Sequence, residues 1–323
     1  MKILVTGGAG FIGSHVVDAY INEGHEVLVM DDLSSGKTEN INPKARFFKA
    51  DIRSAEAREI ISRERPDAIN HHAAQISVPA SVKDPLLDAD INIKGFLNVL
   101  EAAKNSGVKK VIFISSGGAV YGEAKECPST ECCEPSPLSP YAVTKFAGEK
   151  YLAFYCNQYG LDYTVLRYGN VYGPRQIPHG EAGVVAIFME RLVSGKPCVV
   201  YGFPDEPAGM TRDYCYVKNV ATANVLALGK GSCEIFNIGT GVETHTMELF
   251  NTVYSSLRRE VELPAALEKP SAGPARPGDL RRSCLDAKKA EKILGWKAET
   301  GLKDGIDATV PALMRLKGLK GEL

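Results

Sequence analysis

A tyrosine and a lysine four residues apart are the side chains in this sequence best suited to proton transfer. Tyr141 and Lys145 follow directly after Pro140, a residue that suits the first turn of a helix. In a helix this spacing places the phenol and the ammonium on one face, one turn apart. A free phenol titrates near about 10, and a neighbouring positive charge favours its ionised form. Tyr141 is therefore a candidate general base near neutral pH. The alternative is an amphipathic helix that carries a surface lysine.

A glycine-rich run near the start of the chain has the composition of a phosphate-binding turn. Gly7, Gly10 and Gly13 follow the apolar run 2–5 and precede a helical pattern that ends near Gly24. Gly7 permits a tight turn, Gly10 leaves the backbone open to a pyrophosphate, and Gly13 lets the helix lie close to the strand. The helix N-terminus then attracts the anion. Glycines also mark ordinary turns, so this context is essential to the interpretation.

A carboxylate after the second apolar run points to a dinucleotide as the ligand. Asp31 follows residues 26–30 and stands 18 positions after Gly13, close to the distance of about 20 typical of a residue that binds ribose hydroxyls. A carboxylate accepts hydrogen bonds from two ribose hydroxyls and repels a 2′-phosphate, and no arginine follows it closely. We therefore expect NAD rather than NADP.

The elements that must position these residues alternate between strand and helix. Further strand-like runs are 46–50, 67–70, 108–114 and 163–168, and helical patterns cover 54–63, 86–104 and the segment from 140 onward. This alternation predicts an α/β fold with a Rossmann-type doubly wound parallel sheet, whose ligands lie at the carboxyl ends of the strands. We expect an NAD-binding domain over 1–170, with later segments returning to it, and a smaller, mainly substrate-binding α/β region over 171–323. Only the tail after Leu313 looks loosely ordered.

Composition excludes several classes of partner. The chain of 323 residues carries 38 Lys plus Arg against 39 Asp plus Glu, a net charge of −1, which gives no general attraction to nucleic acid or to an anionic membrane. There is no signal-peptide or membrane-span pattern, so we expect a cytoplasmic protein. The eight cysteines form no Cys-x-x-Cys motif, which favours free thiols. His71 and His72 would point to opposite faces of a strand, which argues against a shared metal.

Several of these motifs together resemble a known family. They are Thr6-Gly7-x-x-Gly10-x-x-Gly13, Asp31, Asp51-Ile52, Ser116, Tyr141-x-x-x-Lys145 and Arg167-Tyr168-Gly169-Asn170-Val171-Tyr172-Gly173-Pro174. In order and spacing the chain is similar to the extended short-chain dehydrogenase/reductase family, and within it to the NAD-dependent nucleotide-sugar epimerases. The resemblance runs from residue 1 to about residue 300. The combination is specific, although no single motif is.

The resemblance implies a set of site residues. The catalytic residues would be Tyr141, Lys145 and Ser116. The residues implied to contact NAD are Gly7, Gly10, Phe11, Ile12, Gly13, Asp31, Asp32, Ser35, Gly36, Asp51, Ile52, Ala73, Ala74, Gln75, Asn92, Tyr141, Lys145 and Tyr168. Those implied to contact the substrate are Ser116, Tyr141, Asn170, Arg212, Arg276, Asp279 and Ser283. Two arginines suit a diphosphate, because each offers a fork of donors and keeps its charge. The alternative for both arginines is a surface salt bridge.

The implied reaction is the 4-epimerisation of a UDP-hexose through a 4-keto sugar. UDP-glucose and UDP-galactose would be the main pair, and another nucleotide sugar such as UDP-glucuronate, or a catalytically silent NAD-binding regulator, are the alternatives. Dehydratases and decarboxylases of the family carry an acid shortly before Val-Tyr-Gly, and none precedes Val120 here. One position departs from the family pattern: Gly117 stands where the catalytic Ser or Thr is usual. We expect Ser116 to replace it, or Tyr141 to work alone.

Two further expectations follow from the resemblance. In the epimerases a residue four positions after the Asp of Arg-x-Gly-Asp lines the sugar pocket near C2, and a large aromatic there excludes 2-acetamido sugars. Here that residue is Ser283, so UDP-GlcNAc and UDP-GalNAc should also be accepted, unless Cys284 or the 180–187 segment sets the pocket size. Family members also pair through helices that correspond to 86–104 and 140–159, so we expect a homodimer. The alternative is that the apolar residues of the second helix are buried within one chain.

Overall fold

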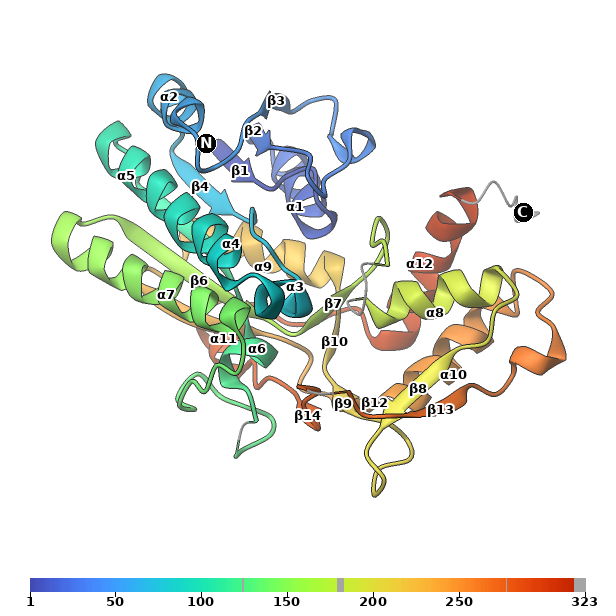
Figure 1. Ribbon diagram of the computed structural model, residues 1–323. Helices are drawn as coiled ribbons and strands as arrows, with labels where there is room; N and C mark the ends of the chain where they lie inside the picture. The colour runs from blue at the N-terminus through green and yellow to red at the C-terminus, as the bar shows by residue number, and fades with distance from the viewer. Residues whose placement is uncertain (124, 179–182, 277, 317–323) are drawn as a thin grey trace.

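Within the part of the chain that the computed structural model describes, residues 1–123, 125–178, 183–276 and 278–316, seven parallel strands form one large sheet (Figure 1). Its strands are β1 (Lys2–Thr6), β2 (Glu26–Asp31), β3 (Arg46–Lys49), β4 (Ala68–His71), β5 (Lys110–Ser116), β6 (Asp162–Tyr168) and β11 (Glu234–Ile238). They are ordered β11-β6-β5-β4-β1-β2-β3. The order reverses between β1 and β4, and ligands of such sheets bind outside the carboxyl ends of the strands at this switch point. The predicted Rossmann-type fold is confirmed.

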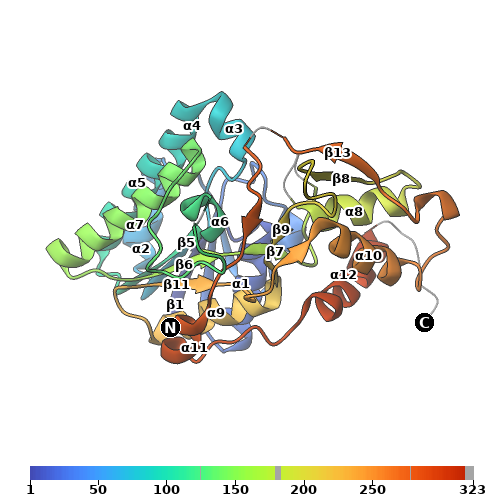
Figure 2. The ribbon, with the colours of Figure 1, turned by 90° about the horizontal axis from the view of Figure 1, so that it is seen from below.

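Helices cover both faces of this sheet, which explains why its central strands are apolar on both sides. The helices α2 (Ala55–Glu64), α5 (Phe96–Ser106) and α7 (Pro140–Tyr159) pack on one face. The other face is covered by α1 (Phe11–Asn22), α9 (Val217–Gly229) and α11 (Lys288–Leu294). Figure 2 shows the two helical layers with the strands between them. The later segments α9 and β11 thus belong to the sheet that the first half of the chain builds.

The rest of the second half forms a smaller region with its own apolar core. Its helices are α8 (Val184–Val193), α10 (Thr246–Leu257) and α12 (Leu302–Leu316), seen beside the large sheet in Figure 1. Its short strands are β7 (Asn170–Tyr172), β8 (Val199–Gly202), β9 (Thr211–Arg212), β10 (Tyr214–Tyr216), β12 (Thr244–His245), β13 (Ser271–Pro274) and β14 (Arg282–Ser283). They pair as β10-β7, β12-β9-β14 and β13-β8. The helix α12 continues past Leu313 to Leu316, and the remainder of the tail that we expected to be loosely ordered lies outside the described residues.

The helix expected over 86–104 is interrupted. The chain forms α3 (Val78–Lys83) and α4 (Pro85–Ala89), then a π-helical segment, η2 (Asp90–Gly95), and only then α5. A π-helical turn is often found at functional sites. Periodicity in the sequence does not reveal it, because one additional residue in a turn changes the apolar spacing very little.

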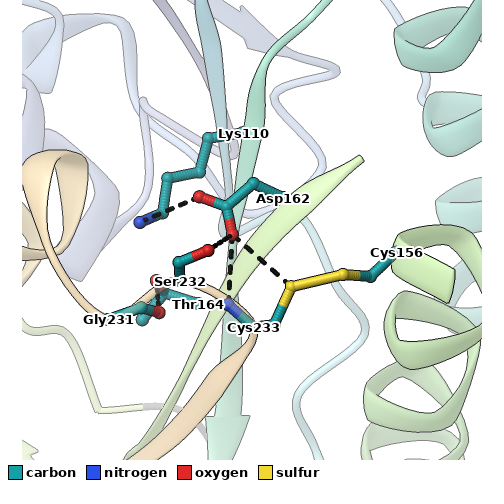
Figure 3. Close-up of a disulfide and its surroundings, with 7 residues drawn as sticks. All are labelled: Lys110, Cys156, Asp162, Thr164, Gly231, Ser232 and Cys233. Carbon is teal, nitrogen blue, oxygen red and sulfur yellow. Dashed lines mark hydrogen bonds and ion pairs between the residues drawn. A yellow bond between two sulfur atoms is a disulfide. The ribbon is translucent and has the colours of Figure 1, made fainter. Parts of the chain in front are cut away.

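A disulfide joins Cys156 in the last turns of α7 to Cys233, the residue before β11 (Figure 3). The expectation of free thiols is wrong for this pair, and the other six cysteines, all within the described residues, are free. Figure 3 shows Asp162 beside the disulfide, where its carboxylate accepts a hydrogen bond from the Cys233 backbone N–H at 3.1 Å. The two cysteines are 77 positions apart. Only the pairing of β6 with β11 brings them together.

Candidate active site

The Tyr141–Lys145 pair lies at the start of α7, as its spacing predicts. The Ser139 hydroxyl caps this helix by accepting a hydrogen bond from the Ala142 N–H at 3.2 Å. The Lys145 ammonium lies 5.9 Å from the centre of the Tyr141 ring. It donates a hydrogen bond to the backbone carbonyl oxygen of Ile114 in β5, at 3.0 Å. Lys145 is only 4% exposed, so α7 carries a buried cation to the end of the central strands.

Burial dominates the titration of both groups. It raises the pKa of Tyr141 to about 12, although a side-chain hydrogen bond with Ser116 acts in the opposite direction and the Asp88 charge adds to the rise. It lowers the pKa of Lys145 to about 8, against the effect of Asp88. In the protein alone, Lys145 thus does not bring the pKa of Tyr141 near neutrality. The expectation of a base near neutral pH also counts the positive nicotinamide of NAD, and it stays a prediction. The lysine is directed at the Ile114 carbonyl, and the phenol loses solvation that the lysine does not replace.

Ser116 occupies the position from which a hydroxyl can reach Tyr141. It ends β5, and its hydroxyl caps the short helix α6 (Gly117–Tyr121) by accepting a hydrogen bond from the Ala119 N–H at 3.5 Å. The neighbouring Gly117 has no room for a side chain, because a Cβ there would lie 2.6 Å from both methyl groups of Leu285. A serine or threonine at 117 would require Leu285 to move. Replacement of the usual Ser or Thr by Ser116 stays a prediction.

The glycine turn fits a pyrophosphate. Gly7 has φ +70°, and a Cβ on it would lie 2.6 Å from the backbone nitrogen of Ala73. A Cβ on Gly13 would overlap with the Gly7 carbonyl oxygen. The helix α1 begins after Gly10, which provides no side-chain cap, so the first amides of this helix keep free N–H donors. A donor-lined turn without side chains suits an anionic group.

Asp31 and the segment after β3 lie at the positions expected for the adenosine end of a dinucleotide. The Asp31 carboxylate accepts hydrogen bonds from the N–H groups of Ala9 (3.0 Å) and Leu33 (2.8 Å). Burial raises its pKa, and two carboxylate oxygens still have acceptor capacity for hydroxyls. The carboxylate of Asp32 accepts from the Ser34 N–H and hydroxyl. Of the neighbouring residues expected at the cofactor, Ser35 is exposed and Gly36 packs beside the Asp31 carboxylate.

Residues 51 and 52 differ in what their side chains contact. Asp51 forms an ion pair with Arg53 at 2.5 Å, which lowers the pKa of that carboxyl. The side chain of Ile52 is buried in the core between the sheet and its helices. The Ile52 carbonyl oxygen accepts a hydrogen bond from the Asn98 amide at 2.7 Å, so its backbone N–H is the group that remains for a ligand.

The segment after β4 faces the glycine turn. Ala73, Ala74 and Gln75 are partly buried there. The Nε2 atom of His72 is buried and has no hydrogen-bond partner in the described part of the protein. Such an orphaned polar atom beside the switch point is consistent with a ligand that completes the site.

Two expected cofactor residues are held mainly by the protein itself. The Asn92 side chain accepts from the Gln75 N–H (2.8 Å) and donates to the Gln75 carbonyl oxygen (3.0 Å). The ring of Tyr168 is buried against α9, and its hydroxyl accepts a hydrogen bond from the Asn224 amide at 2.6 Å. Its backbone lies opposite Ser116 in the β5–β6 register. Both residues therefore position the site.

Apart from Ser116 and Tyr141, the expected substrate residues come from the smaller region, and Ser283 among them lies beside α6. Ser283 pairs with Arg212 in the β14–β9 register, and a Cβ on Gly118 would lie 2.8 Å from the Ser283 hydroxyl. Arg276 forms an ion pair with Asp279 at 3.2 Å, and both charges act on Arg212. Asn170 in β7 is exposed, and its N–H donates to the Asp213 carbonyl oxygen at 2.8 Å. The guanidiniums of Arg212 and Arg276, which we expect at a diphosphate, are thus close enough to interact electrostatically.

Cys284 and the 180–187 segment are the two alternatives to Ser283 for setting the size of the sugar pocket. Cys284 is buried, with its sulfur 3.8 Å from the Asp213 carboxylate. Part of the 180–187 segment lies outside the described residues.

No helix of the described residues is long and apolar enough to cross a membrane, and no group of three or more His, Cys, Asp or Glu among them could hold a metal ion.

Sequence reasoning missed a buried polar layer behind the site. The Glu149 carboxylate and the Arg167 guanidinium pair at 2.6 Å, and both side chains are almost fully buried. Asp88 and Thr144 also hydrogen-bond to each other there, at 2.9 Å. In the sequence, acidic residues at helical spacing are typical of the exposed face of a helix, so they are not predicted to be buried. The signal that was available is Glu149 four residues after Lys145, on the same face of α7.

Comparison with known proteins agrees with this geometry. The model of the NAD dependent epimerase/dehydratase family matches residues 3–239. The solved structure of UDP-glucose 4-epimerase from Thermotoga maritima with UDP-glucose is 48% identical, with a TM-score of 0.92 over 98% of this chain and 100% of that chain. That of the Thermus thermophilus UDP-glucose 4-epimerase with NAD is 45% identical, with a TM-score of 0.89 over 97% of this chain and 98% of that chain.

A third structure extends the range of relatives. UDP-N-acetylglucosamine 4-epimerase from Methanobrevibacter ruminantium, solved with UDP-N-acetylmuramic acid, is 36% identical, with a TM-score of 0.88 over 98% of each chain. The family match covers most of the chain, and the similarity to these structures covers nearly all of it. The chain belongs to the NAD dependent epimerase/dehydratase family.

Proposed function

We propose that this chain is an NAD-dependent isomerase that interconverts UDP-hexoses by inversion at C4. The observation that carries the proposal is the buried Tyr141–Lys145 pair beside Ser116, at the carboxyl ends of strands whose switch point holds the glycine turn. The similarity to UDP-glucose 4-epimerases over nearly the whole chain supports UDP-glucose and UDP-galactose as the main pair. A catalytically silent regulator is disfavoured, because it would have no use for a buried phenol and ammonium.

The site residues divide into those that bind and those that move protons. Gly7, Gly10 and Gly13 would cradle the pyrophosphate of NAD, and Asp31 would accept from the adenosine ribose hydroxyls. Bound NAD would supply a reversible hydride acceptor for the sugar. Tyr141 takes the proton of the 4-hydroxyl as the 4-keto sugar forms, and gives it back when the hydride returns to the other face. Ser116 holds the substrate oxygen beside the phenol, and Lys145 provides the positive charge near it.

The substrate would be held by the smaller region. We assign Arg212 and Arg276 to the diphosphate, with Asp279 and Asn170 beside them, and Ser283 to the sugar at C2. We also keep the division of the chain near residue 170, with α9 and β11 assigned to the NAD-binding domain. The UDP-N-acetylglucosamine 4-epimerase that resembles this chain supports acceptance of acetamido sugars.

The direct test is conversion of each UDP-hexose from its own side. Purified protein, loaded with NAD, is incubated with UDP-galactose and with UDP-glucose in separate reactions. Both should reach the same equilibrium mixture. If neither is converted while UDP-glucuronate is, the substrate assignment is wrong, and if no UDP-sugar is converted the enzymatic proposal fails.

Replacing Ser116 by Ala tests its assigned function. We expect kcat to fall by about 10²-fold or more, as is typical when a partner in proton transfer is lost, with little change in KM. Ser54→Ala is the matched control, because Ser54 also caps a helix, by accepting from the Ala57 N–H at 3.1 Å, but lies beside α2. Initial rates on UDP-galactose give the measurement. Unchanged turnover in Ser116→Ala would mean that Tyr141 works alone.

We further propose that two copies associate through α7 and the segment 86–104, which begins in α4, together with the adjoining α3. In the described structure Leu152 and Tyr155 are buried in the core of one chain, but Val143 and Phe154 on α7 are each 49% exposed. Val82, Leu86 and Leu87 are exposed on the neighbouring helices α3 and α4. A second copy would cover these side chains. Sedimentation should give twice the 34.9 kDa of one chain, and Phe154→Glu should shift the protein to the monomer. A monomeric wild-type chain at micromolar concentration would contradict the dimer.

A further inference from the structure

Asp88 carries a buried carboxylate that forms no salt bridge with any residue of the described ranges and acts electrostatically on both Tyr141 and Lys145. Asp88 lies in the last turn of α4 and is 0% exposed. A carboxylate removed from water is costly unless hydrogen bonds or charges compensate it. Here every compensating contact leads to a residue of the site.

Three hydrogen bonds hold this carboxylate. One oxygen accepts from the Gln75 amide at 2.7 Å and from the Asn92 amide at 3.2 Å. The other accepts from the Thr144 hydroxyl at 2.9 Å. These donors come from the segment after β4, from the π-helical segment η2 and from α7. Asp88 thus joins the three segments that meet around the switch point.

The same carboxylate acts on the reacting pair through space. Thr144 immediately precedes Lys145, so the bond to Asp88 fixes α7 at that point. Asp88 raises the pKa of both Tyr141 and Lys145. For Tyr141 it adds to the larger rise caused by burial, and for Lys145 it opposes the larger fall caused by burial. A negative charge keeps a proton on any neighbouring group, so its effect on both residues has the same sign.

Other ionisable groups near α7 do not replace this effect. Burial lowers the pKa of His71, at the end of β4, and of His72, just after it, and the charge of Lys145 adds to this effect, so both imidazoles stay neutral. Ser116 is the other group that acts on Tyr141. Lys83 and Asp84 on the adjoining helices are exposed. The charged groups on the remaining elements packed against α7 have partners of their own: Asp90 with Arg53 and Lys94, Glu101 with Lys104, Lys110 with Asp162, and Arg167 with Glu149.

We propose that Asp88 is a positioning residue of this active site, which anchors Thr144, Gln75 and Asn92 around the switch point and sets, through its charge, the protonation of Lys145 and Tyr141. Its effect on turnover rests on the proposed function, whereas its effect on Lys145 does not. The carboxylate accepts its hydrogen bonds from Gln75, Asn92 and Thr144 rather than from Tyr141 or Lys145. Its contribution is to hold the pair in place and to keep Lys145 charged over a wider range of pH.

The test separates charge from packing. Asp88→Asn keeps the shape but removes the charge, and Thr144→Val removes one hydrogen bond but keeps the charge. Tyr141 must lose a proton and Lys145 must keep one during the reaction, so both titrations shape the pH profile of kcat/KM. Removal of a neighbouring negative charge lowers the pKa of both groups. Asp88→Asn should move both limbs toward acid, by about one pH unit. Thr144→Val should lower kcat without moving either limb.

A second measurement does not depend on turnover. The Lys145 ammonium is titrated by NMR in protein with labelled lysine, and Lys145→Arg identifies its signal. In Asp88→Asn its pKa should lie below the wild-type value, and in Thr144→Val it should match it. If Asp88→Asn does not fold, Asp88→Ser is neutral and smaller and should give the same shift. An unmoved Lys145 titration, or a uniform loss of kcat with fixed limbs, would reduce Asp88 to a purely structural residue and overturn the proposal. Failure of the proposed function would instead appear as an inactive wild-type chain with the Lys145 shift intact.

Discussion

Replacing Tyr141 by Phe should lower kcat by about 10²- to 10⁴-fold, the range typical of a lost general base. The ring stays, so the packing of α7 and the contact with Lys145 at 5.9 Å from the ring centre should be kept. Only the hydroxyl that accepts the substrate proton is removed. Because that hydroxyl acts in the transition state, KM should change much less than kcat.

Three measurements make the result interpretable. Initial rates on UDP-galactose give kcat and KM, the NAD content of the purified variant shows whether the cofactor site survives, and the melting temperature reports folding. Tyr151→Phe is the matched control, since Tyr151 lies on the same helix but is 37% exposed, and it should retain wild-type turnover. A Tyr141→Phe variant that keeps most of its activity would remove the phenol from the mechanism and leave Ser116 as the remaining hydroxyl.

Replacing Ser283 by Tyr should selectively abolish conversion of UDP-GlcNAc and UDP-GalNAc. The Ser283 hydroxyl lies against Gly118, two residues after Ser116, so a larger side chain would extend into the space beside the reacting sugar. A steric clash discriminates more strongly than the few kcal/mol gained by filling space, about 1–3 kcal/mol per methylene. UDP-glucose and UDP-galactose lack the acetamido group and should still react. Specificity would therefore change by exclusion rather than by lost attraction.

The assay compares both substrate pairs in the same preparation. Ser283→Ala is the control for the hydroxyl, because it removes a hydrogen-bonding group without adding bulk, and it should convert both pairs. Equal loss of activity on both substrate pairs in Ser283→Tyr would mean that the substitution distorts the loop rather than excluding the acetamido group. A wild-type chain that never converts UDP-GlcNAc would dispose of the acetamido prediction.

The sequence by itself was sufficient wherever the chemistry depends on neighbours along the chain. The turn around Gly7 and Gly13, the start of α7 at Pro140 and the Tyr141–Lys145 spacing are local, because strand, turn and helix geometry fix the relative positions of residues a few places apart. The alternation of strands and helices also determined the parallel sheet, since parallel strands require crossover connections. The cofactor and the family followed from the same local motifs. A residue such as Ser283 could be assigned a position only through the resemblance.

Tertiary structure decided everything that depends on burial or on distant segments. The pKa of Tyr141 rises because the folded chain removes it from water, whereas spacing along a helix shows only that a cation is near. Leu285 packs against Gly117 across a long separation in sequence, and the Cys156–Cys233 disulfide depends on the pairing of β6 with β11. In the sequence Asp88 has the pattern of a surface residue, but in the folded chain the π-helical segment and α7 enclose it. Solvation and contact between remote segments are properties of the folded chain, and no pattern along the sequence encodes them directly.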